Sequence, residues 1–396
     1  MASQTICAHA ALRRFLSRIR RHSVDLVAPL SDTDASAQSM PDASPAKWHL
    51  AHTTWFFETF VLAPHVPGYS LFDPAYGFLF NSYYEAAGPR LRRDRRGMLT
   101  RPALAEILAW RAHVDAALDR AIDDLPDSAR TLITLGCHHE QQHQELLLTD
   151  ILHLFSENPI APVYAEDAPF PALNADAHDW LAHPGGIVSI GHAGDSFAFD
   201  CETPRHPELL QPFALGSRLV TNAEWATFID DGGYRMPTLW LSDGWAWAEQ
   251  NDVTAPLYWR REDGGWSTMT LAGRQAVDPA APATHVSYFE ADAFARRAGA
   301  RLPREAEWEA MAENAALSQL FGACWQWTQS AYAAYPGFRP AAGAVGEYNG
   351  KFMCGQFILR GSSCATPEGH ARPTYRNFFY PHQRWQFTGV RLAKDI

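Results

Sequence analysis

The feature that most constrains the fold is a long helical pattern over residues 128–157 that carries two histidines on its apolar face. His139 and His143 are four residues apart, so a helix places both imidazoles on one side. At about 100° per residue, Leu135 and Leu146 lie within about 40° of His139, so the pair belongs to the stripe that faces a core. A core has little use for two neighbouring imidazoles unless something binds them. The pattern predicts a metal site, and an accidental polar pair is the alternative.

The first part of the chain is predicted to be helical. Amphipathic patterns predict four helices, over residues 8–28, 46–63, 103–124 and 128–157. Residues 64–102, between the second and the third, are predicted to be a long loop. Four such helices with one long connection predict a four-helix bundle, and a loop of that length in a compact domain is usually functional. Because the first segment is rich in arginine, an organelle transit peptide is the alternative to a first helix.

The second part of the chain has a different texture. Residues 158–181 are proline-rich without periodicity and are predicted to be a linker. Short β-like runs follow at 186–190, 212–215 and 357–360. Two short helices are predicted near 221–231 and 288–299. We therefore expect an α+β chain of two domains, a helical one over 1–157 and one with sparse regular structure over 182–396.

Composition narrows the function classes. The 396 residues carry a formal net charge of −11, which argues against a general role on nucleic acid or on an anionic membrane. No apolar stretch is long enough to span a bilayer. The six cysteines are scattered and form no CxxC pair, which favours reduced thiols in a cytoplasm and disfavours a cysteine-based zinc site.

A third metal ligand is predicted in the aromatic segment 44–60. On a helical wheel His52 lies with Trp48, Trp55 and Phe56, and His49 lies near one edge of the same face. A satisfied core histidine is the alternative for His52. Three neutral imidazoles leave a divalent metal with open positions, as in a catalytic site, and both zinc and non-haem iron(II) suit them.

Two further segments have both a packing and a functional interpretation. The adjacent Tyr83 and Tyr84 in the long loop are ordinary packing residues or, near a metal–oxygen site, donors of a proton or an electron. The run 372–391 is dense in aromatics, arginines and amides. It is either a final β-hairpin or a pocket for a zwitterion, with aromatics for an ammonium group and Arg or Asn for a carboxylate.

These motifs together resemble the ergothioneine-biosynthesis sulfoxide synthases over nearly the whole chain. The matching stretches are residues 47–56, the run His139-x3-His143-x-Glu145, and residues 346–354, 359–364 and 372–391. The resemblance implies a DinB-like helical bundle followed by a formylglycine-generating-enzyme-like domain of C-type-lectin-like fold. It also implies an enzyme that joins a thiol to the imidazole ring of hercynine, the Nα-trimethyl betaine of histidine, with O2 as oxidant.

The resemblance also implies site residues. Fe(II) is expected on His52, His139 and His143. Gln142 and Asn377 match positions that contact the betaine, and Phe378 and Phe379 follow in the same motif. Tyr83 and Tyr84 match tyrosines near the oxygen site in the subgroup that uses cysteine. Arg90 and Arg384 are our predictions for carboxylate recognition.

The thiol donor is predicted from two departures. Relatives that use γ-glutamylcysteine carry Asp and Arg where this chain has Phe379 and Gln383, which favours free cysteine. A selenosugar, as in a related selenoneine-forming branch, stays open as the donor. Two other classes remain: a zinc-dependent thiol transferase on the same histidines, and a sugar-binding module based on the lectin-like half alone.

Overall fold

The structure is a computed structural model that describes residues 2–171, 177–342 and 344–396. Contacts between Cα atoms divide the chain into two compact units. The first takes residues up to Glu166 together with Ala342–Glu347, and the second takes Asp167–Ala341 and Tyr348–Ile396. In the described part of the chain, no helix is both long and apolar enough to cross a membrane.

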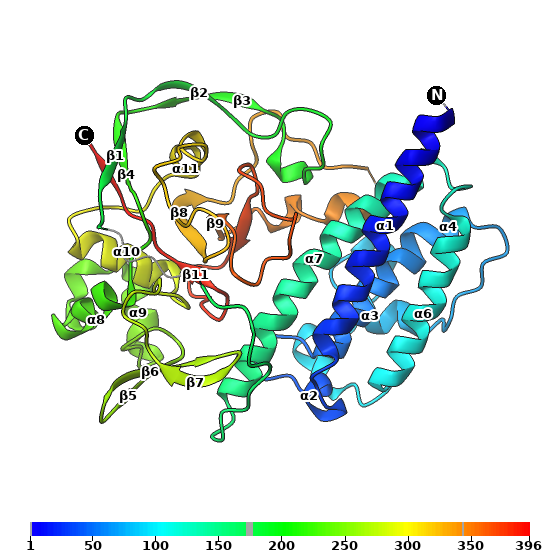
Figure 1. The fold of residues 1–396 in the computed structure, drawn as a ribbon, viewed down its shortest axis with the longest axis horizontal. Helices are drawn as coiled ribbons and strands as arrows, with labels where there is room; N and C mark the ends of the chain where they lie inside the picture. Colours follow the sequence, from blue (N-terminus) through cyan, green and yellow to red (C-terminus); the bar gives the residue numbers. More distant parts are fainter. Residues whose placement is uncertain (1, 172–176, 343) are drawn as a thin grey trace. The chain divides into compact units, whose positions relative to one another are not determined.

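The first unit is built on four long helices that run side by side in Figure 1. These are α1 (Ala2–Val27), α3 (Ala46–Phe57), α6 (Leu104–Ala121) and α7 (Asp127–Ser156). Their positions agree with the predicted segments, and the predicted four-helix bundle is confirmed. Shorter helical pieces complete the unit: α2 (Asp32–Ser36), η1 (Glu58–Leu62), α4 (Ala63–His65), α5 (Tyr76–Phe80), η2 (Glu85–Ala87), η3 (Arg93–Met98) and η7 (Ala344–Glu347).

The predicted loop 64–102 is thus partly helical, in pieces of three to six residues that are too short to give a periodic pattern. The predicted helix 46–63 also changes character at Glu58, where a π-helical turn follows α3. The buried Glu58 side chain accepts hydrogen bonds from the Tyr69 hydroxyl (2.8 Å) and the Phe72 backbone N–H (3.0 Å), which ties this turn to the start of the loop.

The described residues of the second unit form four small sheets and short helices, as expected for an α+β domain. The strand orders are β1-β4-β12, β10-β9-β8-β11, β2-β3 and β5-β6-β7. The strands are β1 (Trp180–His183), β2 (Gly186–Ile190), β3 (His206–Leu210), β4 (Phe213–Gly216), β5 (Trp259–Glu262), β6 (Gly265–Thr270), β7 (Gly273–Ala276), β8 (Trp325–Ala331), β9 (Phe357–Gly361), β10 (Asn377–Phe379), β11 (Thr388–Gly389) and β12 (Ala393–Asp395). β1 begins at Trp180, inside the segment predicted as a linker.

The helices of this unit include the two predicted ones, α8 (Asn222–Asp230) and α10 (Tyr288–Arg297). The remaining helical segments were not predicted: η4 (Asp200–Glu202), η5 (Gly233–Arg235), η6 (Pro237–Leu239), α9 (Ser242–Gln250), α11 (Glu305–Ala310) and η8 (Gly350–Phe352). The β-hairpin considered for 372–391 does not form. Its strands β10 and β11 lie at opposite edges of one sheet, where β10 pairs with β9 and β11 pairs in parallel with β8.

Candidate metal centre

The site begins with a close contact between α3 and α7. Every residue of α3 is buried, and α7 faces it through Gly136. A Cβ atom at Gly136 would lie 2.6 Å from Cε1 of Phe57, so only glycine allows this approach. His139 follows Gly136 by three residues, so the same contact brings the face of α7 that carries His139 and His143 against α3.

Three imidazoles meet between these helices. One nitrogen from each of His52, His139 and His143 lies within 4.8 Å of the others, and these are the residues predicted from the sequence. His52 and His139 are buried, and His143 is partly buried. The ring centroids are 4.7–5.0 Å apart, and the His139 ring is nearly perpendicular to the other two. Because two metal–nitrogen bonds of about 2.1 Å span at most about 4.2 Å, a shared ion requires the rings to move slightly inward.

The protonation of these rings fits a metal ion. His52 Nδ1 lies 2.6 Å from the carbonyl oxygen of Phe80, which can only accept, so Nδ1 carries the proton. The lone pair is then on Nε2, a buried atom that makes no hydrogen bond in the described structure. Burial, together with the His139 imidazole, lowers the pKa of His52 well below its usual 6.5. Burial also lowers the pKa of His139 to about 3. Neutral imidazoles are the form that binds metal.

Aromatic rings hold His52 on both faces. Trp48 stacks on it at 4.8 Å and 10°, and Trp55 lies on the other side at 5.5 Å and 16°. The guanidinium of the buried Arg96 lies 3.3 Å from the centre of the Trp48 ring, and its Nη atoms donate to the hydroxyls of Ser44 and Ser82. The stacked tryptophans fix the plane of the His52 ring, and the hydrogen bond to the Phe80 carbonyl fixes how the ring is turned within that plane.

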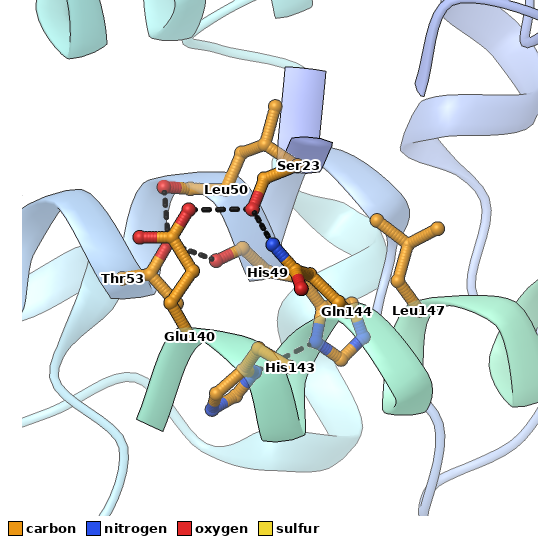
Figure 2. A pocket seen from close by; sticks show the side chains of 8 residues that line it. All are labelled: Ser23, His49, Leu50, Thr53, Glu140, His143, Gln144 and Leu147. Atoms are coloured by element: carbon orange, nitrogen blue, oxygen red, sulfur yellow. Dashed lines mark hydrogen bonds between the residues drawn. The ribbon is translucent and has the colours of Figure 1, made fainter. Parts of the chain in front are cut away.

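A second histidine of α3, His49, contacts the His143 ring. His49 Nδ1 lies 2.9 Å from His143 Nδ1 (Figure 2). His49 Nε2 lies 3.1 Å from the carboxylate of Asp150. Asp150 also accepts the backbone N–H of Ser44 at 2.8 Å, near the start of α3. A polar chain therefore runs from α7 through α3 and back to a ligand position on α7.

A buried ionic cluster lies next to His139 in the sequence. The Glu140 carboxylate accepts from Arg20 Nη1 (3.0 Å), from Arg111 Nη2 and from the Ser23 hydroxyl (2.5 Å). Burial alone would raise the pKa of Glu140, but Arg111 and Arg20 bring it down to about 2. Between this cluster and the His49–His143 pair lies a cavity of about 10 Å³, room for roughly one water molecule. Figure 2 shows its lining: Ser23, His49, Leu50, Thr53, Glu140, His143, Gln144 and Leu147.

The two predicted tyrosines lie beside Trp55, one of the rings that pack on His52. Tyr84 is fully buried, 5.5 Å from Trp55 and 5.2 Å from Phe60 by ring centroids. Tyr83 stacks on Tyr84 at 4.6 Å, with 3.4 Å between the two hydroxyl oxygens. Trp55 therefore lies in contact with both Tyr84 and His52.

The tyrosine loop is fixed at both ends. The amide of Asn81 donates to the carbonyls of Tyr84 (2.9 Å) and Gly88 (3.1 Å), and its Oδ1 accepts the Tyr84 N–H (3.1 Å). The carboxylate of Glu347, from the η7 segment of the same unit, accepts the backbone N–H groups of Glu85 and Ala86 at 3.0 and 2.9 Å.

The other predicted residues lie as follows. Gln142 is partly buried on α7. Arg90 forms an ion pair with Glu85 in the same loop. In the second unit, Phe378 stacks on Tyr332 at 4.1 Å, and the Asn377 Oδ1 accepts the Phe378 N–H. The remaining two are Phe379, 6.5 Å from Trp385 between ring centroids, and Arg384, which pairs with the buried Glu290 at 3.0 Å. Both arginines thus have a carboxylate partner within the chain, and their roles toward substrate stay predictions.

Sequence reasoning assigned no role to four partners of the site, namely His49, Phe80, Asp150 and Glu347. Asp150 had a signal, because it lies seven residues after His143 and hence on the same helical face. His49 was placed only at the edge of its face. The Phe80 contact uses a backbone carbonyl, and the Glu347 carboxylate contacts residues that lie 262 and 261 positions earlier in the chain. No pattern of residues in the sequence predicts either contact.

Comparison with known proteins covers the whole chain. A model of the DinB superfamily matches residues 16–147, and a model of the sulfatase-modifying factor enzyme 1-like domain matches 167–319 and 311–396. The chain is 33% identical to a hercynine oxygenase of Mycolicibacterium thermoresistibile, covering 100% of this chain and 97% of that protein. It is 32% identical to a hercynine oxygenase of Mycobacterium tuberculosis over 96% and 98% of the two chains. A formylglycine-generating enzyme of Streptomyces coelicolor is 37% identical over 32% of this chain and 44% of that protein.

Proposed function

This chain belongs to the hercynine oxygenase family, and on that premise we propose that it joins a thiol to the imidazole ring of hercynine, with O2 as oxidant, in ergothioneine synthesis. The proposed metal is Fe(II), held by His52, His139 and His143. The proposed thiol is cysteine, and the product is the hercynyl cysteine sulfoxide.

One observation carries the proposal: three imidazoles converge between α3 and α7 at a point where the buried Nε2 atom of His52 has no hydrogen-bond partner in the described structure. Leaving such a nitrogen buried and unsatisfied costs about 1–3 kcal/mol, and a metal ion removes that cost. Three histidines leave open positions for other ligands, which a purely structural site does not need. When bound, the ferrous ion supplies the redox chemistry with O2 that imidazoles, phenols and carboxylates lack.

The reaction balances without a further co-reactant. A C–H bond of the imidazole ring and the S–H bond of the thiol are broken, and a C–S bond forms. One oxygen atom of O2 ends on sulfur as the sulfoxide, and the other leaves as water with the two hydrogens. Since O2 takes all the electrons, no external reductant is needed.

The chain's own residues have distinct roles in this proposal. The histidines hold the metal, and the Phe80 carbonyl keeps the proton of His52 on Nδ1. Tyr84 is the proposed proton donor, supported by its burial against Trp55, which also packs on His52, and Tyr83 is its hydroxyl neighbour. Gln142, and on the second unit Asn377, Phe378 and Phe379, stay in the proposal as hercynine contacts on the resemblance alone.

Cysteine is the proposed donor because the chain lacks the Asp and Arg expected for γ-glutamylcysteine, having Phe379 and Gln383 instead. The Gln383 side chain accepts the Tyr380 N–H at 3.0 Å, a local backbone contact. A selenosugar donor is the competing proposal.

The test is an aerobic assay of the Fe(II)-loaded protein with hercynine, offering cysteine, γ-glutamylcysteine and a selenosugar in parallel, read by mass spectrometry. We expect the sulfoxide with cysteine, no product without O2, and neither iron binding nor C–S formation in His139→Ala. If product formed only with the selenosugar, the selenosugar and not cysteine would be the donor. Thiol transfer by the Zn(II)-loaded protein without O2 would replace the function with a zinc-dependent transferase.

A further inference from the structure

We propose that His49 and Asp150 position the His143 ring for metal binding through a hydrogen-bonded chain from carboxylate to imidazole to imidazole. The inference rests on the proposed metal site, and it assigns the tautomer of His143 and the residues that set it. His49 itself is not proposed as a ligand.

The chain is short, continuous and sheltered. Asp150 Oδ2 lies 3.1 Å from His49 Nε2, and His49 Nδ1 lies 2.9 Å from His143 Nδ1. His49 and Asp150 are 3% and 6% exposed, so water does not compete strongly for these bonds. Both ring nitrogens of His49 are thereby used within the protein, which leaves none for a metal.

The direction of the bonds follows from what each group can do. An ionised carboxylate only accepts, so the proton of His49 lies on Nε2 and points to Asp150. In a neutral His49 the Nδ1 atom is then an acceptor, and it takes the N–H of His143 Nδ1. The lone pair of His143 is left on Nε2, the remaining nitrogen of that ring. His52 reaches the same state through the Phe80 carbonyl.

The opposite arrangement does not support a metal. If His49 carried protons on both nitrogens, it would donate to His143 Nδ1, and His143 would keep its proton on Nε2. That nitrogen could not then bind an ion, and a cationic ring would lie beside a divalent metal. Metal binding therefore selects the arrangement in which Asp150 and His49 pull the His143 proton onto Nδ1.

The test measures metal binding and its spectrum, using Fe(II) without O2 and Co(II), whose visible absorption reports the ligand set. His49→Phe keeps a ring of similar size but removes both hydrogen bonds. His49→Asn restores an acceptor near the position of Nδ1. The matched control is His153→Phe on α7, the helix that carries His143 and Asp150, where the histidine Nδ1 instead contacts the Ser39 hydroxyl at 2.8 Å. Thermal unfolding of each metal-free variant shows whether it is folded.

We expect His49→Phe to bind metal about 10–100-fold more weakly, with an altered Co(II) spectrum, as for other partners of metal-bound histidines. His49→Asn should recover part of that loss, and His153→Phe should bind as the unsubstituted protein does. The inference is overturned if folded His49→Phe binds within about threefold of the unsubstituted protein with the same spectrum, or if His49→Asn is as weak as His49→Phe. If His139→Ala binds metal as tightly as the unsubstituted protein, the proposed metal site itself fails.

Discussion

Replacing Glu140 by glutamine should destabilise the fold through two arginines that lie behind the metal centre. Glu140 is 1% exposed and accepts hydrogen bonds from Arg20 and Arg111, which are 3% and 1% exposed. Without its charge, two buried guanidiniums share one partly exposed carboxylate, that of Asp115, which lies 2.6 Å from Arg20 Nε. The cluster changes from neutral to positive inside the bundle.

Two arguments give a similar magnitude. Removing one partner of a buried ion pair costs about 3–5 kcal/mol, because the other charge stays buried. Independently, Arg111 and Arg20 overcome the effect of burial and lower the pKa of Glu140 from 4.5 to about 2. That difference stabilises the folded state by about 3 kcal/mol at 1.36 kcal/mol per pKa unit. Because the folded pKa is the lower one, the stabilisation is complete above about pH 4.5 and is lost as the pH falls towards about 2.

The assay is urea unfolding of the metal-free protein. We expect Glu140→Gln to lose about 3–5 kcal/mol, and Glu157→Gln, an exposed glutamate at the end of the same helix, to change by less than about 0.5 kcal/mol. Adding Arg111→Met to Glu140→Gln restores the charge balance, so the double variant should lose about 1–3 kcal/mol less than the two single losses added together. A loss below about 1 kcal/mol in Glu140→Gln, or strict additivity in the double variant, would refute the reasoning.

Three other predictions concern the helix contact and the tyrosine loop. Gly136→Ala should cost about 1–3 kcal/mol and weaken Co(II) binding, since its Cβ would lie 2.6 Å from a ring carbon of α3. Gly77→Ala, where no atom lies within 4 Å, is the control. Tyr84→Phe and Tyr83→Phe, made separately, should lower the ratio of sulfoxide to simply oxidised cysteine, and no change in either variant would end the proton-donor role. Asn81→Ala should release the tyrosine loop and cost about 1–3 kcal/mol, visible as faster amide exchange around residue 84.

The long helices and the cluster of His52, His139 and His143 were accessible to sequence reasoning because both depend on helical period. His139 and His143 are neighbours on any α-helix, and His52 shares its face with aromatic residues that must be buried. Their convergence needed one further fact, that α3 and α7 pack against each other. The bundle supplies it, and Gly136 sets the distance.

The partners of these ligands were not accessible in the same way. The acceptor for His52 is a backbone carbonyl at the end of α5, a helix of five residues inside a segment predicted as loop. Helix ends leave such carbonyls without an intrahelical partner, but a side-chain pattern cannot say which ring will use one. In the second unit α11 was missed because six residues give too few turns for a clear apolar stripe. The helix α9 is as long as the predicted α8, but it buries only the small residues Gly244 and Ala248, which give no apolar stripe.

One helix, α7, determines most of the electrostatics of the site. It carries two of the proposed ligands, the carboxylate that we propose orients one of them through His49, and the carboxylate that balances Arg20 and Arg111. Asp150 is bonded to His49 of α3, and Glu140 is bonded to Arg20 of α1 and Arg111 of α6, so the two acids fix α7 to different neighbours. A rotation of α7 that moved the imidazoles would break both sets of bonds. The positions of the two imidazoles therefore depend on both sets of bonds. Glu140 bonds Arg20, Arg111 and Ser23, so we expect its substitution to act mainly on stability. His49 bonds His143 directly, so we expect its substitution to act mainly on metal affinity.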